Sequence, residues 1–345
     1  MPTAKIKMLV LSLTGICNYA CRYCYAAKHD DSIMTSQTAR QAIDIAAQSG
    51  KSFILQFSGG EPLLNFKTLQ AAVEYVENKN LPASMQIQTN ASLITDDIAR
   101  YLYRHKVAIG VSLDGRPAVN DRLRLTKDGR GATAATLQGI EILKRNNIAC
   151  GLTCVVTAEN VRELPGIVEF AYFLGNVRRI GFDLLRGQGR GADLQPPSAE
   201  EMAAAIKVVY AKADYLENLT GHKMQFSQIE KAARFVKEGC QGFGHCTAMT
   251  GEAAFADAKG KLYACASMVG DADFYIGSAA TGLDKQRMLL VQRRISNAMG
   301  VCRQCKDFKM CGGGCFARWY GNGLRQPYTS ECEVKKISIS KVNKM

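Results

Sequence analysis

The sequence has no apolar run long enough to span a bilayer, no cleavable export signal, no long internal repeat and no low-complexity tract. A membrane span needs about 20 consecutive apolar residues, whereas serine and threonine interrupt the short apolar stretch at the N-terminus. These absences argue against a membrane-spanning protein. With 47% hydrophobic and 8% aromatic residues, the 345-residue chain suits one large globular domain with a smaller one, and we expect it in the cytoplasm.

Cysteine is abundant, with thirteen residues in a chain that shows no export signal. Disulfides explain them poorly, because the cytosol keeps thiols reduced and the count is odd. Bound metal ions or iron–sulfur clusters are the better explanation.

Apolar, β-branched runs alternate with segments of helical period. The expected strands are 7–13, 52–58, 85–89, 107–113, 151–157 and 178–185. The expected helices between and after them are 35–49, 66–79, 95–105, 132–146 and 160–174. Such alternation predicts an α/β fold with a parallel sheet curled into a partial (β/α)6 TIM-type barrel, whose chemistry lies at the C-terminal ends of the strands.

Changes in composition divide the chain into four expected parts. Residues 1–190 form the barrel, and 191–239 form a linker that begins with Gly, Pro and polar residues and continues into two helices near 199–219 and 225–238. A cysteine-dense unit follows at 240–335, and a basic tail at 336–345 carries no motif.

The first cysteine group follows the first strand and reads CNYACRYCY, which places Cys17, Cys21 and Cys24 in a C-x3-C-x2-C spacing with Tyr23 before the last. Three thiolates this close in sequence can hold one cubane and leave its fourth iron open to another ligand. The alternatives are a zinc knuckle without its fourth ligand, or three unrelated thiols.

This loop, with its aromatic residue and its place after the first strand, resembles the signature of the radical S-adenosylmethionine (SAM) superfamily. The resemblance implies that a reduced [4Fe-4S] cluster splits SAM into methionine and a 5′-deoxyadenosyl radical, which abstracts a substrate hydrogen. The protein would position that radical and exclude water and oxygen.

Further motifs downstream fit the same resemblance. FSGGEPL follows the second strand, and its glycines allow a close backbone approach while its glutamate suits the SAM ammonium group, although a plain turn would use Gly-Gly equally well. Arg124 matches an arginine that meets the SAM carboxylate in related maturases, with a surface arginine as the alternative. The residues expected to bind the cofactor are Tyr23, Gly59, Gly60, Glu61, Gln88, Asn90, Ser112, Asp114 and Arg124.

From residue 240 onward, the cysteine pattern resembles that of the SPASM domain of peptide and sulfatase maturases. The resemblance implies two auxiliary [4Fe-4S] clusters, and three clusters in all. Cluster one would use Cys240, Cys246, Cys265 and Cys315; cluster two would use Cys302, Cys305, Cys311 and Cys332. Two zinc ribbons are the alternative. Cys150 and Cys154 remain, and we expect both in the core.

The formal net charge of +13 would ordinarily indicate an acidic partner. Three thiolate-bound cubanes lower it to roughly +8, because a four-thiolate site carries about −2 and a three-thiolate site about −1. The remaining excess fits an acidic leader peptide or an electron donor of the flavodoxin or ferredoxin type, or simply a solvated basic surface. We expect neither a membrane nor a nucleic acid as partner.

Enzymes with this pair of domains mostly modify peptides or proteins. Sulfatase maturases place Asp after the cysteine that aligns with Cys265, but here the residue is Ala266, which cannot act as a base. The stretch CASMVGDADFYIGS resembles maturases of thioether-bridged (sactipeptide-type) peptides instead. We therefore expect a crosslinking peptide maturase, with formylglycine formation, a small-molecule reaction such as haem biosynthesis, and a non-catalytic electron carrier as alternatives.

The sequence does not identify the substrate base. Four acidic candidates are unranked: Asp183, Glu252, Asp271 and Asp273. Because the first strand starts near residue 7, we expect leader recognition to use a separate protein or another surface.

Overall fold

Six parallel strands form the centre of the computed structural model, which describes residues 5–240, 242–323 and 328–344. They are β1 (Met8–Ser12), β2 (Phe53–Ser58), β3 (Ala83–Thr89), β4 (Ala108–Ser112), β5 (Cys150–Val156) and β6 (Val177–Leu184). All six strands expected from the sequence are present, and they pair in chain order. The expected parallel α/β architecture is confirmed.

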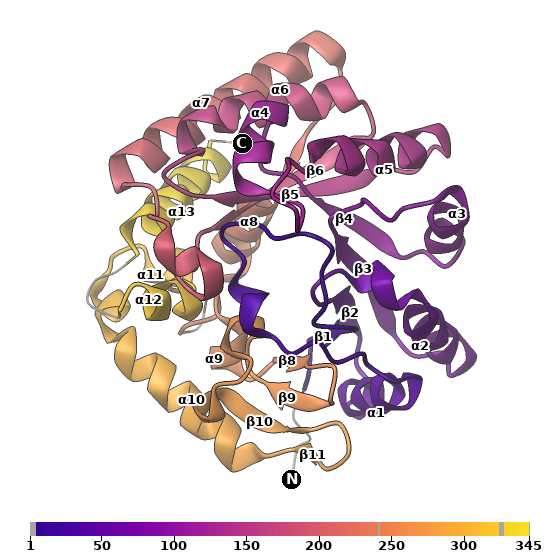
Figure 1. Ribbon diagram of the computed structural model, residues 1–345. Helices are drawn as coiled ribbons and strands as arrows, with labels where there is room; N and C mark the ends of the chain where they lie inside the picture. Colours follow the sequence, from indigo (N-terminus) through magenta and orange to yellow (C-terminus); the bar gives the residue numbers. More distant parts are fainter. Residues whose placement is uncertain (1–4, 241, 324–327, 345) are drawn as a thin grey trace.

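The helices cover the outside of this sheet, and the strands curve around a common centre (Figure 1). Five helices confirm the expected ones: α1 (Ser36–Ala47), α2 (Phe66–Asn78), α3 (Asp96–Arg104), α5 (Thr133–Arg145) and α6 (Leu164–Leu174). Thr35 and Thr95 start α1 and α3, because each hydroxyl accepts a hydrogen bond from a backbone N–H in the first turn. A short helix that we did not predict, α4 (Pro117–Leu123), follows β4.

The strands separate apolar from polar side chains. Leu9, Leu11, Leu55 and Phe57 are buried in the main hydrophobic core. Other side chains of the strands bond to one another across the sheet: Gln86 donates to Gln56 (2.7 Å), Gln88 to Ser112 (2.8 Å), and Thr153 to Gln88 (3.1 Å). Alternate strand residues point to opposite faces, so the barrel acquires a polar interior.

The sheet continues beyond the six-stranded centre on both sides. β7 (Gln225–Phe226) pairs with β6, and β8 (Ala253–Ala256) pairs in parallel with β1. Antiparallel strands then follow in the order β9 (Lys261–Tyr263), β10 (Tyr275–Ser278) and β11 (Gly282–Leu283). The cysteine-dense region therefore begins by extending the barrel sheet.

Helices of the C-terminal half pack beside the barrel. α7 (Ala199–Thr220) and α8 (Ser227–Glu238) confirm the two expected helices, and both contact α13 (Thr329–Val342). The remaining helices of this half are α9 (Thr247–Thr250), α10 (Lys285–Ala298), α11 (Phe308–Cys311) and α12 (Phe316–Gly321). Most of the expected basic tail at 336–345 thus belongs to a packed helix. No helix in the described ranges is long and apolar enough to cross a membrane.

Candidate active site and cysteine clusters

The loop after β1 carries Cys17, Cys21 and Cys24 over the C-terminal ends of the strands. Two backbone hydrogen bonds tie it to the segment after α4: Ala20 N–H donates to Leu125 (2.6 Å), and Arg22 N–H donates to Leu123 (2.8 Å). The end of α4, the helix that we did not predict, and the residues just after it therefore support the cysteine loop.

The glycine pair after β2 packs against the base of this loop. A Cβ on Gly59 would lie 2.4 Å from the Thr14 carbonyl oxygen, and one on Gly60 would lie 2.1 Å from that of Ile16. Gly59 also has φ +140°, a conformation that favours glycine. Both glycines are thus required by the close approach of the cysteine loop itself.

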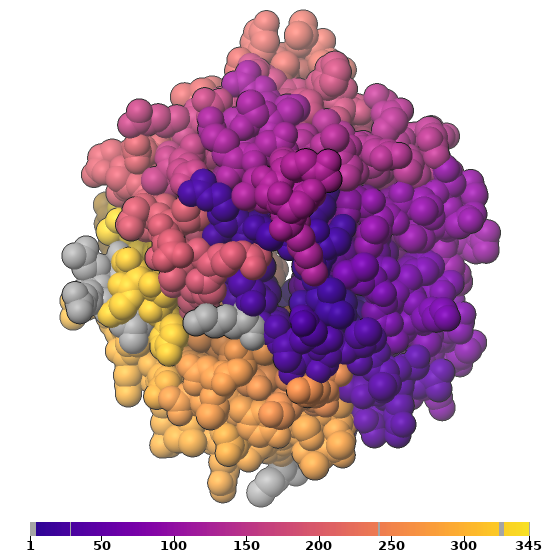
Figure 2. Space-filling model, viewed as in Figure 1, coloured from indigo at the N-terminus to yellow at the C-terminus, as the bar shows by residue number. Residues whose placement is uncertain are grey.

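The three thiols share one cavity of about 320 Å³ at the C-terminal ends of the strands. Figure 2 shows the hollow near the centre of this face, bordered by the indigo N-terminal segment. The described lining includes every expected cofactor-binding residue except Asp114. The lining residues come from five neighbouring strands, β2 to β6, and from the loops that follow strand ends. Their contacts with a bound cofactor remain a prediction.

Glu61 lies at the start of the turn after β2 and is almost fully buried. Its carboxylate accepts hydrogen bonds from Leu63 N–H (3.1 Å), Thr89 Oγ1 (2.6 Å) and Asn90 N–H (2.8 Å). Burial raises the pKa of Glu61, while these three donors act in the opposite direction. Glu61 therefore fastens the end of β3 to the end of β2, whether or not it also meets an ammonium group.

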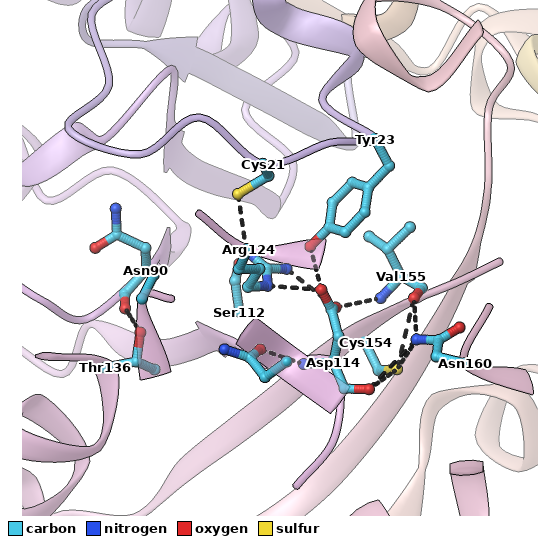
Figure 3. A network of polar contacts seen from close by, with 12 residues as sticks. Cys21, Tyr23, Asn90, Ser112, Asp114, Arg124, Thr136, Cys154, Val155 and Asn160 are labelled. Carbon is cyan, nitrogen blue, oxygen red and sulfur yellow. Dashed lines mark hydrogen bonds and ion pairs between the residues drawn. The ribbon is translucent and has the colours of Figure 1, made fainter. Parts of the chain in front are cut away.

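Asp114 lies behind the cavity wall and holds two residues of that wall in place (Figure 3). Its carboxylate accepts a hydrogen bond from Tyr23 Oη and one from Val155 N–H (2.8 Å). It also forms an ion pair with Arg124, whose Nε lies 2.9 Å from Oδ2. Asp114 thus positions Tyr23 and Arg124.

Arg124 is a buried residue of the cavity wall, so the alternative of a surface arginine is wrong. Burial alone would lower its pKa, but the Asp114 carboxylate raises it, and the guanidinium stays charged. Its Cζ lies 5.3 Å from the centre of the Tyr23 ring, and its Nη1 lies 3.9 Å from Cys21 Sγ. This places a fixed cation beside the cysteine loop.

Two of the loop thiols are hard to ionise in the cluster-free chain. Burial raises the pKa of Cys17 to about 11 and that of Cys21 to about 12. Iron binds the thiolate form, so cluster assembly must displace these protons.

A series of linked ion pairs lies at the end of β6, on the opposite side of the same cavity, with Arg318 and Glu331 buried and Asp183 and Arg186 half-buried. Asp183 and Arg186 line the cavity, and Arg186 Nη2 lies 2.6 Å from Asp183 Oδ2. Arg318 of α12 bridges the other oxygen of Asp183 (2.7 Å) to Glu331 of α13 (2.6 Å). The sequence did not predict these linked ion pairs, because their members lie far apart in sequence. Asp183 and Arg318, for example, are 135 residues apart.

This geometry ranks the four acidic candidates for the substrate base. Only Asp183 lines the described part of the cavity, whereas Glu252 pairs with Lys7 at the other end of β1 and Asp273 pairs with Arg294. Burial raises the pKa of Asp183, but Arg186 and Arg318 together hold it below the ordinary value. Asp183 is thus the one candidate of the four in the described cavity lining, and its lowered pKa makes it a weak base. Asp271 accepts from Tyr320 Oη (3.3 Å).

The second cysteine region contains a cavity of about 410 Å³. Four cysteines line it, and they are the four expected at cluster two: Cys302, Cys305, Cys311 and Cys332. Burial raises the pKa of Cys332 to about 11, and the neighbouring Glu331, Cys311 and Cys302 add to the shift. The convergence of these thiols fits one polynuclear site, and that assignment remains a prediction.

Three thiols expected at cluster one also lie together. Burial raises the pKa of Cys246 to about 12, and the nearby Cys315 and Cys265 add to the shift. The described contacts of Cys240 are with α11 and the turn after it instead: its N–H donates to the Lys309 carbonyl oxygen (2.8 Å), and its Sγ would lie 2.6 Å from a Cβ on Gly312. Its place as the fourth ligand of cluster one stays a prediction.

Two further observations concern the remaining thiols and single metal ions. Cys150 and Cys154 are buried on β5, so their expected place in the core is confirmed. In the described ranges, no group of three or more His, Cys, Asp or Glu side chains converges as the ligand set of a single metal ion.

The chain matches the model of the Radical SAM superfamily over residues 11–171. An uncharacterized protein of Methanocaldococcus jannaschii, MJ0907, is 33% identical over 267 residues, which cover 77% of this chain and 86% of that protein. The similarity to MJ0907 therefore covers more of this chain than the match to the family model does.

Two enzymes with named activities are also similar. A serine-type anaerobic sulfatase-maturating enzyme of Klebsiella aerogenes is 28% identical over 332 residues, covering 89% of this chain and 79% of that enzyme. The radical SAM cyclopropyl synthase TigE of Paramaledivibacter caminithermalis is 32% identical over 197 residues. That second match spans 51% of this chain and 41% of the synthase.

Solved structures share the fold at low identity. Native anSMEcpe with bound AdoMet and Cp18Cys peptide superposes with a TM-score of 0.79 at 19% identity, covering 98% of this chain and 97% of that chain. Streptococcus suis SuiB bound to its precursor peptide SuiA gives a TM-score of 0.70 at 15% identity, with 95% and 74% covered. These likenesses confirm the α/β fold with its cysteine-rich C-terminal region.

Proposed function

This chain belongs to the radical SAM superfamily, and we propose that it is a peptide-modifying maturase with three [4Fe-4S] clusters. Membership of the superfamily implies one [4Fe-4S] cluster and SAM. When bound, these groups supply a 5′-deoxyadenosyl radical that abstracts a substrate hydrogen. The convergence of Cys17, Cys21 and Cys24 with eight of the nine expected cofactor-binding residues in one cavity carries the proposal.

The residues around the cavity would divide the work of holding the cofactors. The three thiols would bind the cluster, and the open iron would receive the amino acid end of SAM. Arg124, kept charged by Asp114, would face the SAM carboxylate, and Asn90 and Ser112 offer hydrogen bonds from the neighbouring strand ends.

A peptide substrate is favoured by the fold and by the C-terminal half. The chain shares its fold with anSMEcpe and SuiB, which were each solved with a bound peptide. We propose that residues 240–335 form a SPASM domain with two auxiliary clusters, the second of them in the cavity that holds Cys302, Cys305, Cys311 and Cys332. The most direct reaction is crosslink formation in a ribosomally made peptide.

Formylglycine formation is the second candidate, because the similarity to the Klebsiella aerogenes sulfatase-maturating enzyme covers 89% of this chain. Ala266 follows Cys265 at the start of a short 3₁₀ helix and offers no proton acceptor. Of the four acidic candidates, Asp183 alone lines the described part of the cavity, and two arginines hold it ionised. These residues favour the crosslinking reaction over formylglycine formation.

The test uses the anaerobically reconstituted protein with SAM, dithionite and deuterated short peptides encoded beside its gene. We expect deuterium to move from a peptide into 5′-deoxyadenosine, and the peptide to lose two hydrogens without forming an aldehyde that a hydrazide traps. A trapped aldehyde would support formylglycine formation instead. Deuterium transfer from no peptide, with 5′-deoxyadenosine still formed, would refute a peptide substrate and direct the search to small molecules.

A further inference from the structure

Arg186 stands in the cavity wall that faces the expected SAM-binding residues. It follows β6 directly, and Leu185 N–H donates to Val156 (2.9 Å), which fixes the backbone at this point. The expected SAM contacts come from the ends of β2, β3 and β4 and from the segment after α4. A ligand group near Arg186 would therefore be held from the other side of the barrel.

The guanidinium of Arg186 is fixed on two sides. Its Nη2 donates to Asp183 Oδ2 at 2.6 Å, and its Cζ lies 4.8 Å from the centre of the Tyr25 ring. Asp183 cannot swing away easily, because Arg318 donates to its other oxygen at 2.7 Å. The position of Arg186 is thus built into the fold by contacts from three elements.

Most N–H donors of this guanidinium have no hydrogen-bond partner among the described residues. Arginine has five N–H donors, and in the described part of the chain only Nη2 of Arg186 forms a hydrogen bond. Its Nε is fully buried and has no hydrogen-bond partner among the described residues. A buried donor without an acceptor is costly, so this atom indicates an acceptor that arrives with a ligand.

We propose that Arg186 receives a carboxylate of the substrate. A guanidinium fork matches a carboxylate in shape as well as in charge, and the Nε and Nη1 of Arg186 have no partner among the described residues. For the peptide substrate of the proposed function, on which this inference rests, the carboxylate is an acidic side chain or the C-terminus. Arg186 would then anchor the substrate, and the adjacent C–H bond would lie within the cavity that the cysteine loop closes.

Arg186 lies between two of the expected cysteine groups. The positive charge of Arg186 acts on the thiol of Cys265, one of the expected ligands of cluster one, and Tyr25 beneath the guanidinium follows Cys24 of the first group. A substrate held by Arg186 would therefore lie between the radical-forming site and the first auxiliary site.

The test compares small probes on the reconstituted, SAM-bound protein by ligand-observed NMR titration. N-acetylglutamate N-methylamide represents an acidic side chain, N-acetylglycine represents a C-terminus, and N-acetylglutamine N-methylamide is the uncharged control. We expect one carboxylate probe to bind the wild-type protein at least tenfold more tightly than the amide, a ratio typical of one charge-assisted hydrogen-bonded pair. The probe that binds identifies the source of the carboxylate.

Three variants decide whether Arg186 is responsible. Arg186→Gln should remove the preference, with affinity for the carboxylate falling roughly 10- to 100-fold, and Arg186→Lys should retain part of it, since it keeps the charge and loses the fork. Arg162→Gln, at an exposed arginine that pairs with Glu201, is the matched control and should bind like wild type. Iron content and the circular dichroism spectrum establish that each variant is folded and loaded.

Several results would overturn the inference. These are equal binding of carboxylate and amide probes by the wild type, a preference that persists in Arg186→Gln, or a loss of SAM binding alone in that variant. The formation of 5′-deoxyadenosine tests the proposed function independently of these binding results. A protein that cleaves SAM and shows no carboxylate preference refutes the inference alone, whereas a preference without SAM cleavage refutes the proposed function alone.

Discussion

Replacing Asp114 with asparagine should release Tyr23 and Arg124 from the cavity wall. The carboxylate is fully buried and accepts from Tyr23, from Val155 N–H at 2.8 Å and from Arg124 Nη2 at 3.2 Å. Removing one partner of a buried ion pair costs about 3–5 kcal/mol, because the other charge stays buried without compensation. Against a total stability of about 5–15 kcal/mol, this is a large loss.

A double-mutant cycle isolates the contribution of the pair. Asp114→Asn, Arg124→Gln and the double variant are compared with the wild type by urea unfolding of the cluster-free protein, followed by circular dichroism. We expect the double variant to be less destabilised than the sum of the single variants, with a coupling energy of about 1–3 kcal/mol. Asp128→Asn, at an exposed ion pair with Arg130 in the same segment, is the control and should change little.

The same variants test the link from this ion pair to the cofactor. Arg124 is expected to meet the SAM carboxylate, so Asp114→Asn should weaken SAM binding by roughly tenfold or more even where the cluster is loaded. Strictly additive unfolding energies would refute the view that Asp114 and Arg124 act as a pair. Unchanged SAM affinity in Asp114→Asn would refute the role of Asp114 in positioning Arg124.

Three further outcomes follow from the geometry. Gly60→Ala should displace the cysteine loop and lower iron loading, because its Cβ would lie 2.1 Å from the Ile16 carbonyl oxygen, whereas Gly300→Ala meets no atom within 4 Å and should load normally; equal iron contents would contradict this packing. Iron loading should fall as pH is lowered from about 8.5 to about 6.5, since burial raises the pKa of Cys17 and Cys21 and cluster assembly must release their protons; a pH-independent iron content would count against it. A chelator should strip the site at exposed Cys305 before the others, as followed by loss of visible absorbance, and simultaneous loss of all clusters would show that exposure does not control release.

The sequence was sufficient for the barrel because its strands are short, apolar and separated by capped helices. Parallel strands that are covered by helices show such runs clearly, and Thr35 and Thr95 mark two helix starts. The lining of one cavity wall was predictable for a different reason, since most of its residues lie at or just after strand ends, where parallel sheets collect their functional groups. Local patterns therefore located both the fold and one wall of the site.

The opposite wall was beyond such patterns. The sequence predicted no site residue in the segment after β6, yet Arg186 in it lines the cavity. Its support comes from Arg318 and Glu331, whose proximity depends on how α12 and α13 pack beside β6. Helix α13 itself was missed because ISIS within it alternates apolar and polar residues, a pattern typical of a strand. The arrangement of this wall depends on long-range packing, which the local periodicity of a sequence does not predict.

The iron content of the anaerobically reconstituted chain tests the central claim most directly. Three [4Fe-4S] clusters predict about twelve irons per wild-type chain, and about eight when Cys17, Cys21 and Cys24 are replaced together by alanine. About four irons in the wild type would contradict the two auxiliary clusters. An unchanged iron content in the triple variant would contradict the cluster site at the mouth of the barrel.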